Sequence, residues 1–286
     1  MKISGKELAG EVYEDIQKKL AILKRNKIIP QLIIAKSSNI DAVNNYIGQK
    51  VKKGEKVGIK VEVIELGDHD YRHKMKIKER ILQINKSPKN HGIIFQKPSN
   101  IHIDEEIESL IDTNKDVDGF LCMSAHKPPV YRGVMRVLEK ISNLKEKKLI
   151  SYLKKKKIAL IGRGKTGGQT VISGLKTDGF NVGQLRIIDS KTPKNTIKEY
   201  ITEADIIISA VGKSNPVDFT LFSKKAILID IGVHFDQQNK IKGDYNEEDI
   251  KEQVGYYTTT PGGIGVLTVA YLMDNVVNAA MNTIIN

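Results

Sequence analysis

The chain has 286 residues, of which 40% are hydrophobic and 28% are charged. This length suits about two domains, and this balance is typical of a globular protein rather than of a disordered one. The start of the chain has no signal-peptide core, and no stretch reaches the ~20 apolar residues that a membrane-spanning helix needs. We therefore expect a cytoplasmic protein with no membrane partner.

The formal net charge of +12 is compatible with nucleic-acid binding. However, the densest basic run, residues 145–157, has few aromatic side chains on which bases could stack, so we interpret it as solvated surface. No nucleic-acid partner is expected. The one cysteine, Cys122, excludes an internal disulfide and favours a reducing compartment. We expect it to be a buried packing residue, and we expect no metal site because the histidines lack metal-ligand spacing.

The first half of the chain alternates helical and extended patterns. Residues 5–23 repeat apolar side chains every four positions, which predicts a helix with one buried stripe. Further helices are predicted for residues 42–53 (ending at Gly54), 71–84, 104–111 and 131–144. Strands are predicted for residues 31–35, 57–66, 92–95 and 117–122. This alternation indicates a mostly parallel sheet with helices on its faces.

After about residue 145 the alternation begins again. Strands are predicted for residues 157–161, 185–188, 205–209, 226–230 and 255–259. Helices are predicted from the glycine loop at residues 162–168 to residue 175, and for residues 196–201 and 266–285. The chain therefore reads as an α/β protein of two domains.

The glycine loop has the spacing of a dinucleotide site. Gly162, Gly164 and Gly167 match G-x-G-x-x-G directly after a predicted strand and at the start of a predicted helix. In this pattern the first glycine turns the chain, the second admits the pyrophosphate, and the third lets the helix approach the sheet. Helix N-terminal N–H groups then face the phosphates. The second domain is therefore predicted to be Rossmann-like.

The choice between NAD and NADP stays open. Asp189 ends the next predicted strand, where an acid can bind a ribose 2′-hydroxyl, and it would repel a 2′-phosphate. Arg163 and Lys191 favour the 2′-phosphate of NADP. Asp189 is equally typical of a simple turn at a strand end.

A second candidate site lies in the first half of the chain. Tyr46 and Lys50 are four residues apart on a predicted helix and so project from one face. A lysine in a partly apolar cleft loses proton affinity and can act as an acid or base, although such a pair is also common on exposed surfaces. Gln96 and Asp118 stand near strand ends, where ligands of parallel sheets collect, although Asp118 also suits a turn.

A proline followed by two glycines stands before the last helix, at Pro261, Gly262 and Gly263. Closely spaced glycines let the backbone pass close to a ligand or to another segment of chain. Taken alone, this segment is more typical of a tight turn.

Together, these motifs resemble those of the bifunctional methylenetetrahydrofolate dehydrogenase/methenyltetrahydrofolate cyclohydrolase family, in order and over almost the whole chain. The matching positions are Tyr46 with Lys50, Gln96 with Pro98, residues 115–120, Gly162 and Arg163 with Gly167 and Gly168, and residues 210–213, 230–232, 243–244 and 261–268.

The resemblance implies a folate domain of residues 1–145 plus 267–286, with the last helix returning to it, a dinucleotide-binding domain of residues 146–266, and a homodimer. It implies that Lys50, Tyr46 and Gln96 are catalytic. The implied substrate-binding residues are Tyr46, Asp118, Pro261, Gly262 and Gly263. The implied cofactor-binding residues are Gly162, Arg163, Gly164, Gly167, Asp189, Ser190, Gly212 and Ile231.

The implied reactions are oxidation of 5,10-methylenetetrahydrofolate with NADP, or else NAD, and hydrolysis of the methenyl product to 10-formyltetrahydrofolate. Tetrahydrofolate derivatives, polyglutamylated ones included, are the implied partners. The chain departs from the family pattern at Val43 and Gly164, where serines are usual, and in residues 128–131. These departures leave open whether both activities are present. The alternatives are another NAD(P)-dependent oxidoreductase of the same fold and a diverged, non-catalytic cofactor-binding protein.

Overall fold

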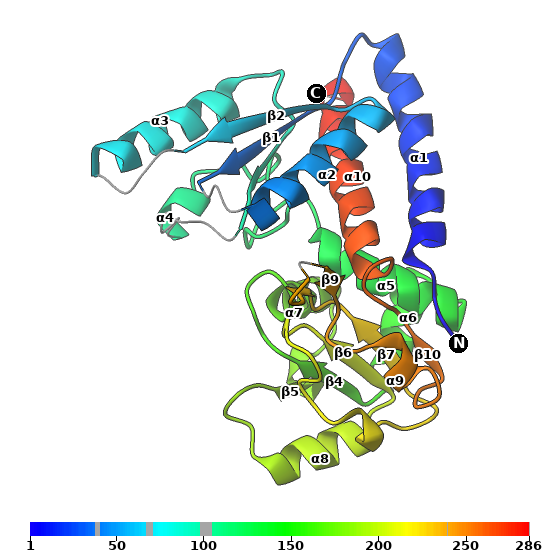
Figure 1. Ribbon diagram of the computed structural model, residues 1–286. Coiled ribbons are helices and arrows are strands. Elements are labelled where there is room, and N and C mark those ends of the chain that lie inside the picture. Colours follow the sequence, from blue (N-terminus) through cyan, green and yellow to red (C-terminus); the bar gives the residue numbers. More distant parts are fainter. Residues whose placement is uncertain (38–40, 67–70, 98–104, 239, 286) are drawn as a thin grey trace. The chain divides into compact units, whose positions relative to one another are not determined.

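The computed structural model describes residues 1–37, 41–66, 71–97, 105–238 and 240–285 (Figure 1). Contacts between Cα atoms divide the chain into two units. One, the five-stranded unit, comprises Met1–Gly10 and Val130–Thr268, and the other, the three-stranded unit, comprises Glu11–Pro129 and Val269–Asn286.

The three-stranded unit is built on a short parallel sheet with the strand order β2-β1-β3. The strands are β1 (Gln31–Lys36), β2 (Lys60–Glu65) and β3 (Gly92–Phe95), and the helices are α1 (Gly5–Arg25), α2 (Asp41–Val57), α3 (Tyr71–Lys86), α4 (Glu105–Glu108) and α10 (Ile264–Ile285). Side chains of a strand alternate between the two faces of a sheet. Ile33 and Ile93 pack with Ile81 of α3 on one face, while Leu32 and Ile34 are buried on the other. Helices therefore cover both faces, as the sequence predicts.

The final helix, α10, belongs mainly to the three-stranded unit. Lys19 of α1 forms a 2.6 Å ion pair with Asp274, and Gly54 of α2 lies against the Met273 side chain. By length and mean hydropathy (1.4), residues Ile264–Ile284 could cross a membrane, which the count of consecutive apolar residues did not indicate. Because 61% of the most apolar window is buried inside the protein, this helix has the character of a core helix, and such helices pass the same test.

The five-stranded unit contains an all-parallel sheet with the strand order β10-β7-β6-β4-β5. Its strands are β4 (Ile158–Ile161), β5 (Arg186–Ile188), β6 (Ile206–Ser209), β7 (Ile227–Asp230) and β10 (Tyr256–Tyr257), and its helices are α5 (Pro129–Ser142), α6 (Glu146–Leu153), α7 (Gly168–Thr177), α8 (Lys194–Thr202) and α9 (Glu247–Ile250). A small antiparallel hairpin follows β7, with strands β8 (His234–Phe235) and β9 (Ile241–Lys242). The chain runs outward from β4 to β5 and then returns to β6 on the other side, so the strand order reverses between β4 and β6. That crevice is where doubly wound sheets bind ligands.

The division by contacts differs from the predicted boundary near residue 145, because α5 packs within the five-stranded unit. The Tyr131 side chain is fully buried there, and its hydroxyl donates to Asp178 Oδ2 at 2.6 Å. Gly133 of the same helix lies close to Leu267.

Three local expectations from the sequence are wrong. Residues 117–122 form turns and bends rather than a strand, because Gly119 takes a φ of +67° and reverses the chain. Helix α2 does not stop at Gly54; this glycine is a packing position, since a Cβ there would lie 2.5 Å from the Val61 side chain. Cys122 is exposed rather than buried, because it lies in that loop and not in a core strand.

The basic run at residues 145–157 contains helix α6, which the sequence reading did not predict. Leu149, Ile150 and Leu153 are buried, so this helix turns one apolar face inward while most of its lysines stay exposed. The run therefore has a packing role as well as a solvated face.

Gly174 of α7 should be intolerant of a side chain. A Cβ at this position would lie 2.2 Å from Cγ of the fully buried Tyr131 ring. We expect Gly174→Ala to lower the free energy of unfolding by roughly 1–3 kcal/mol, because a well-packed core accommodates extra atoms poorly. Urea unfolding measures this change. Gly10→Ala in α1 is the matched control, since a Cβ there meets no atom of the described residues within 4 Å and should be neutral or stabilising. Equal stability of Gly174→Ala and wild type would contradict the packing argument.

Candidate functional site

Helix α2 and the end of β3 bring together the lysine, tyrosine and glutamine that the sequence singled out. Lys50 is buried, with 7% of its surface exposed. Its Nζ donates a hydrogen bond to Gln96 Oε1 at 2.9 Å and lies 5.1 Å from the centroid of the Tyr46 ring. The predicted shared helix face is therefore confirmed, and Gln96, distant in sequence, joins it.

The ionisable groups of this cluster perturb one another. Burial lowers the pKa of Lys50, and the nearby Asp118 charge partly opposes that change. Burial raises the pKa of Asp118 to about 6, against the opposing effect of Lys50. Burial also raises the pKa of Tyr46. Near neutral pH, Asp118 is thus mostly ionised, and Lys50 gives up its proton more readily than an exposed lysine does.

Gln96 is itself held in place. Its Nε2 donates to the Lys97 carbonyl oxygen at 2.7 Å, which directs the other end of the amide, Oε1, toward Lys50. Lys97 forms a 2.6 Å ion pair with Glu108 and lies 5.2 Å from the centroid of the Phe120 ring. Pro98, which matches the family pattern together with Gln96, lies outside the described residues.

The loop that carries Asp118 is folded by its neighbours. Asp116 Oδ1 accepts a hydrogen bond from the Gly119 N–H at 3.1 Å, and its Oδ2 accepts one from the Leu121 N–H at 2.8 Å. A Cβ at Gly119 would lie 2.6 Å from the His126 carbonyl oxygen, so only glycine fits this reversal. Asp118 therefore lies in a turn, as one interpretation of the sequence expected. Because its charge acts on Lys50, it also stays a candidate binding residue, which was the other interpretation.

Two further side chains tie this loop to helices of the same unit. Lys115 Nζ donates to three backbone carbonyl oxygens at the end of α3 and just beyond it, at 2.6 to 3.2 Å. Asn275 of α10 donates from Nδ2 to the carbonyl oxygens of Val117 and Lys127, at 2.9 and 3.0 Å. Sequence reasoning missed Asn275, because an asparagine inside an apolar helix gives no local sign of a partner 158 residues away.

In the five-stranded unit, the glycine loop connects β4 to α7 as predicted. Gly162 has a φ of +85°, and a Cβ there would lie 2.6 Å from the Ala210 carbonyl oxygen. At Gly164, no atom of the described residues lies within 4 Å of an added Cβ, which leaves the open space that a pyrophosphate needs. The closest approach of helix and loop is at Gly168, whose Cβ would lie 2.1 Å from the Gly162 carbonyl oxygen, rather than at Gly167. The residues present thus fit a dinucleotide.

The other predicted cofactor residues follow the neighbouring strands. Gly212 comes after β6 with a φ of +73°, and a Cβ there would be only 3.0 Å from the Val233 carbonyl oxygen. Ile231 follows β7, and its N–H donates to the Ser209 carbonyl oxygen at 2.8 Å. Carboxyl ends of parallel strands lie at one edge of a sheet, so these residues share an edge with the glycine loop.

Asp189 takes part in a turn at the end of β5. Its Oδ1 accepts hydrogen bonds from the Lys191 N–H at 2.9 Å and from the Thr192 hydroxyl at 3.3 Å. Arg163, Ser190 and Lys191 are exposed. One oxygen of the Asp189 carboxyl group is therefore engaged in hydrogen bonds of its own turn, while the side chains of Arg163 and Lys191 face solvent.

The proline-glycine segment approaches the start of α1 within the five-stranded unit. Gly262 has a φ of +101°, and a Cβ at Gly5 would lie 2.1 Å from the Gly263 carbonyl oxygen. These glycines are thus needed for a close passage of two backbones. Pro261, Gly262 and Gly263 belong to a different unit from Lys50.

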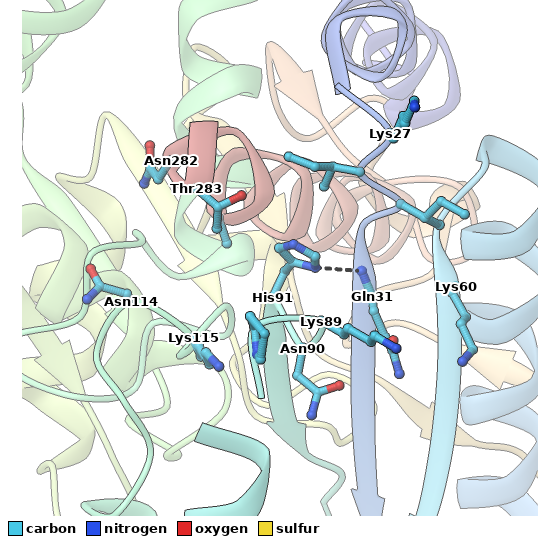
Figure 2. A pocket seen from close by; sticks show the side chains of 14 residues that line it. Lys27, Gln31, Lys60, Lys89, Asn90, His91, Asn114, Lys115, Asn282 and Thr283 are labelled. Carbon is cyan, nitrogen blue, oxygen red and sulfur yellow. Dashed lines mark hydrogen bonds between the residues drawn. The ribbon is translucent and has the colours of Figure 1, made fainter. Parts of the chain in front are cut away.

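A cavity of about 770 Å³ lies elsewhere in the three-stranded unit (Figure 2). Gln31 and Lys60 begin their strands here and His91 precedes β3, so this is the amino edge of the sheet, where parallel sheets do not usually bind ligands. Its buried polar atoms already have partners: His91 Nδ1 accepts from the Gln31 N–H at 3.2 Å, as Figure 2 shows, and Lys115 binds backbone carbonyls. Among the described residues that line it, none belongs to the predicted site. The candidate active site is therefore the Lys50 cluster.

Comparison with known proteins agrees with both halves of this description. Two family models match: tetrahydrofolate dehydrogenase/cyclohydrolase, catalytic domain, over residues 3–118, and the NAD(P)-binding domain of the same description over residues 129–284. The bifunctional protein FolD of Wolbachia sp. subsp. Drosophila simulans is 32% identical over 97% of this chain and 94% of its own. That of Mycoplasma genitalium is 34% identical over 86% and 85%. The crystal structure of the bifunctional enzyme FolD from Campylobacter jejuni matches with a TM-score of 0.85 and 27% identity, over 99% of both chains.

Removing the charge of Asp118 should lower the pKa of Lys50 further. The Asp118 carboxylate is the charge that opposes the effect of burial on this lysine, so Asp118→Asn leaves burial unopposed. NMR titration of the Lys50 side chain, in wild type and variant, measures the change. The control is Asp112→Asn, because Asp112 acts on Lys115 instead. An unchanged Lys50 pKa in Asp118→Asn would show that the two groups are not electrostatically coupled.

Proposed function

The chain belongs to the tetrahydrofolate dehydrogenase/cyclohydrolase family, and on that premise we propose that the Lys50 cluster carries its chemistry. The protein oxidises 5,10-methylenetetrahydrofolate to the 5,10-methenyl form with NAD(P) and hydrolyses the product to 10-formyltetrahydrofolate. Both family domains match, so a different oxidoreductase or a non-catalytic binding protein is not favoured. The observation that supports the proposed site is a buried lysine that is bonded to Gln96 and electrostatically coupled to Asp118.

Lys50 is proposed to move protons in the hydrolytic step. Water attacks the electron-poor methenyl carbon and must lose a proton, while a ring nitrogen must gain one as the carbon–nitrogen bond opens. A lysine with a lowered pKa gives up its proton more readily than an exposed lysine does, and general acid–base assistance contributes roughly 10²–10⁴-fold to a rate. Gln96 would keep the Lys50 ammonium pointed at one place, which makes it a positioning partner.

Asp118 and Tyr46 are proposed to hold the folate. An ionised Asp118 carboxylate can accept hydrogen bonds from pteridine N–H groups, and such charge-assisted bonds are strong where water is excluded. The Tyr46 ring provides a flat face against which a heterocycle can stack. Pro261, Gly262 and Gly263 are the remaining proposed substrate-binding residues.

The cofactor-binding residues are proposed to be Gly162, Arg163, Gly164, Gly167, Asp189, Ser190, Gly212 and Ile231. When bound, the nicotinamide supplies the acceptor for the hydride that leaves the methylene carbon. We favour NADP over NAD because Arg163 is exposed and able to bind a 2′-phosphate, whereas Asp189 Oδ1 is engaged in its own turn.

The remaining proposals concern partners and location. We propose a cytoplasmic homodimer that acts on tetrahydrofolate derivatives, polyglutamylated ones included. The net charge of +12 supports this choice of substrate, since a positive field attracts anionic tails.

Replacing Lys50 tests the catalytic proposal. Lys50→Met should lower cyclohydrolase turnover by at least about 100-fold, because the proton-transfer group is lost. Absorbance of methenyltetrahydrofolate reports the hydrolysis, while cofactor binding and the melting temperature report the fold. Lys52→Met is the matched control, because Lys52 lies exposed on the same helix. Turnover near the wild-type value in Lys50→Met would remove Lys50 from the mechanism.

Cofactor choice is tested at Asp189 and Arg163. Wild type should show the higher dehydrogenase kcat/KM with NADP, and Arg163→Ala should reduce that preference about tenfold through loss of a charge-assisted contact. Asp189→Ser should increase the preference for NADP, since it removes a negative charge near the 2′-position. Asp218→Ser is the control, because Asp218 caps a similar exposed turn by accepting from the Thr220 N–H and hydroxyl. A wild-type preference for NAD that Asp189→Ser reverses would show that the acid governs the choice.

A further inference from the structure

Asp244, a residue to which the sequence patterns assigned no role, holds the loop after β6. The side chain is completely buried. Its Oδ2 accepts hydrogen bonds from the Ser209 hydroxyl at 2.5 Å and the Val211 N–H at 2.9 Å. Its Oδ1 accepts from the N–H groups of Gly212 at 2.8 Å and Lys213 at 3.0 Å. One carboxylate therefore fixes most of the segment from residue 209 to residue 213.

The surrounding backbone leaves room for this carboxylate. A Cβ at Gly232 would lie 2.0 Å from Asp244 Oδ1, so any larger residue would displace the side chain. The Asp244 carbonyl oxygen also accepts from the Asn215 N–H at 2.7 Å, so both its side chain and its main chain bind this loop.

A second buried acid stands beside the first. Asp230, also completely buried, accepts a hydrogen bond from the Tyr245 N–H at 3.2 Å, and a Cβ at Gly243 would lie 2.2 Å from its Oδ2. Burial, and then the charge of Asp244, raise the pKa of Asp230 to about 7. Near neutral pH Asp230 is therefore substantially protonated, and it stands beside the Asp244 carboxyl group, which accepts the four hydrogen bonds described above.

The loop that Asp244 holds contacts the glycine loop. The Ala210 N–H donates to the Ile161 carbonyl oxygen at 2.8 Å, and the Ala210 carbonyl oxygen lies 2.6 Å from where a Cβ of Gly162 would be. A shift of residues 210–213 would therefore displace the backbone that faces the pyrophosphate site, at the point where the strand order reverses between β4 and β6.

We propose that Asp244 is a positioning residue for the dinucleotide: it holds residues 210–213 in the conformation that the cofactor binds, and it does not contact the cofactor itself. This inference rests on the proposed assignment of Gly212 and the glycine loop to the cofactor site. The inference predicts that loss of Asp244 weakens the dehydrogenase reaction and not the cyclohydrolase reaction, because the hydrolysis of methenyltetrahydrofolate consumes no dinucleotide.

The test is Asp244→Asn, which keeps the shape of the side chain but replaces one acceptor oxygen by an NH₂ group. At least one backbone N–H then faces another donor instead of an acceptor, because only the Ser209 hydroxyl can turn round to accept, and a buried donor without a partner is costly. We expect the dehydrogenase KM and Kd for NADP to rise about tenfold or more. Cyclohydrolase turnover of added methenyltetrahydrofolate should stay within about twofold of wild type, since the Lys50 cluster is untouched.

Asp236→Asn is the matched control. Asp236 also accepts two backbone N–H groups through one oxygen, from Gln238 and Lys240, both at 2.9 Å, but it lies in the β8–β9 hairpin. Its cofactor KM should equal that of wild type. If Asp244→Asn does not fold, Ser209→Ala decides the question: it removes one of the four bonds and should raise the cofactor KM a few-fold, again without loss of cyclohydrolase turnover.

Unchanged cofactor affinity in the folded Asp244→Asn or in Ser209→Ala would overturn the inference, and so would an equal loss of both activities, which indicates a general effect on folding. Failure of the proposed function looks different. If wild type itself binds neither NADP nor NAD, then the cofactor site is misassigned, whatever the variants do.

Discussion

The cost of burying the Lys50 charge determines the construction around it. An ammonium taken out of water must find partners or lose its proton. Among the described residues, Lys50 has one hydrogen bond, from Nζ to Gln96 Oε1, and the nearby charge of Asp118. Neither partner is a free surface group. Gln96 is oriented by the Lys97 carbonyl, and the Asp118 loop is folded by Asp116 and Gly119. A lysine compensated only in part has a lowered pKa, and that is the property a proton-transfer group needs.

The five-stranded unit also contains a buried polar side chain that needs partners. Asp244 is completely buried, and its two carboxyl oxygens accept four hydrogen bonds from residues 209–213. Asp244 thus fixes the loop after β6, and Asp116 likewise fixes the loop that carries Asp118. Because the N–H groups of these loops point at a side chain, the loop conformation is set before any ligand arrives, which reduces the ordering that binding would otherwise require.

Much of this arrangement was predictable from local patterns. Strands of Ile and Val and the glycine spacing after β4 indicate the parallel sheets and the dinucleotide loop, and the four-residue spacing places Tyr46 and Lys50 on one helix face. Local patterns failed where packing between distant segments decides. Helix α2 continues through Gly54, where the Val61 side chain packs in the place that a Cβ would take. Residues 117–122 form turns, because Gly119 takes a positive φ and Asn275 donates to the Val117 carbonyl oxygen.

The sequence by itself determined the fold class and the family, and it singled out the residues that we propose for the chemistry, because periodicity and motif spacing are local properties of the chain. The tertiary structure alone decided which of these residues meet. Gln96 reaches Lys50 only once β3 lies beside β1 in the folded sheet, and Asp244 reaches the β6 loop only after the hairpin has turned back. Hydrogen bonds and the electric fields of buried charges act over a few ångströms, so their partners are set by the packing of the sheet and not by distance along the sequence.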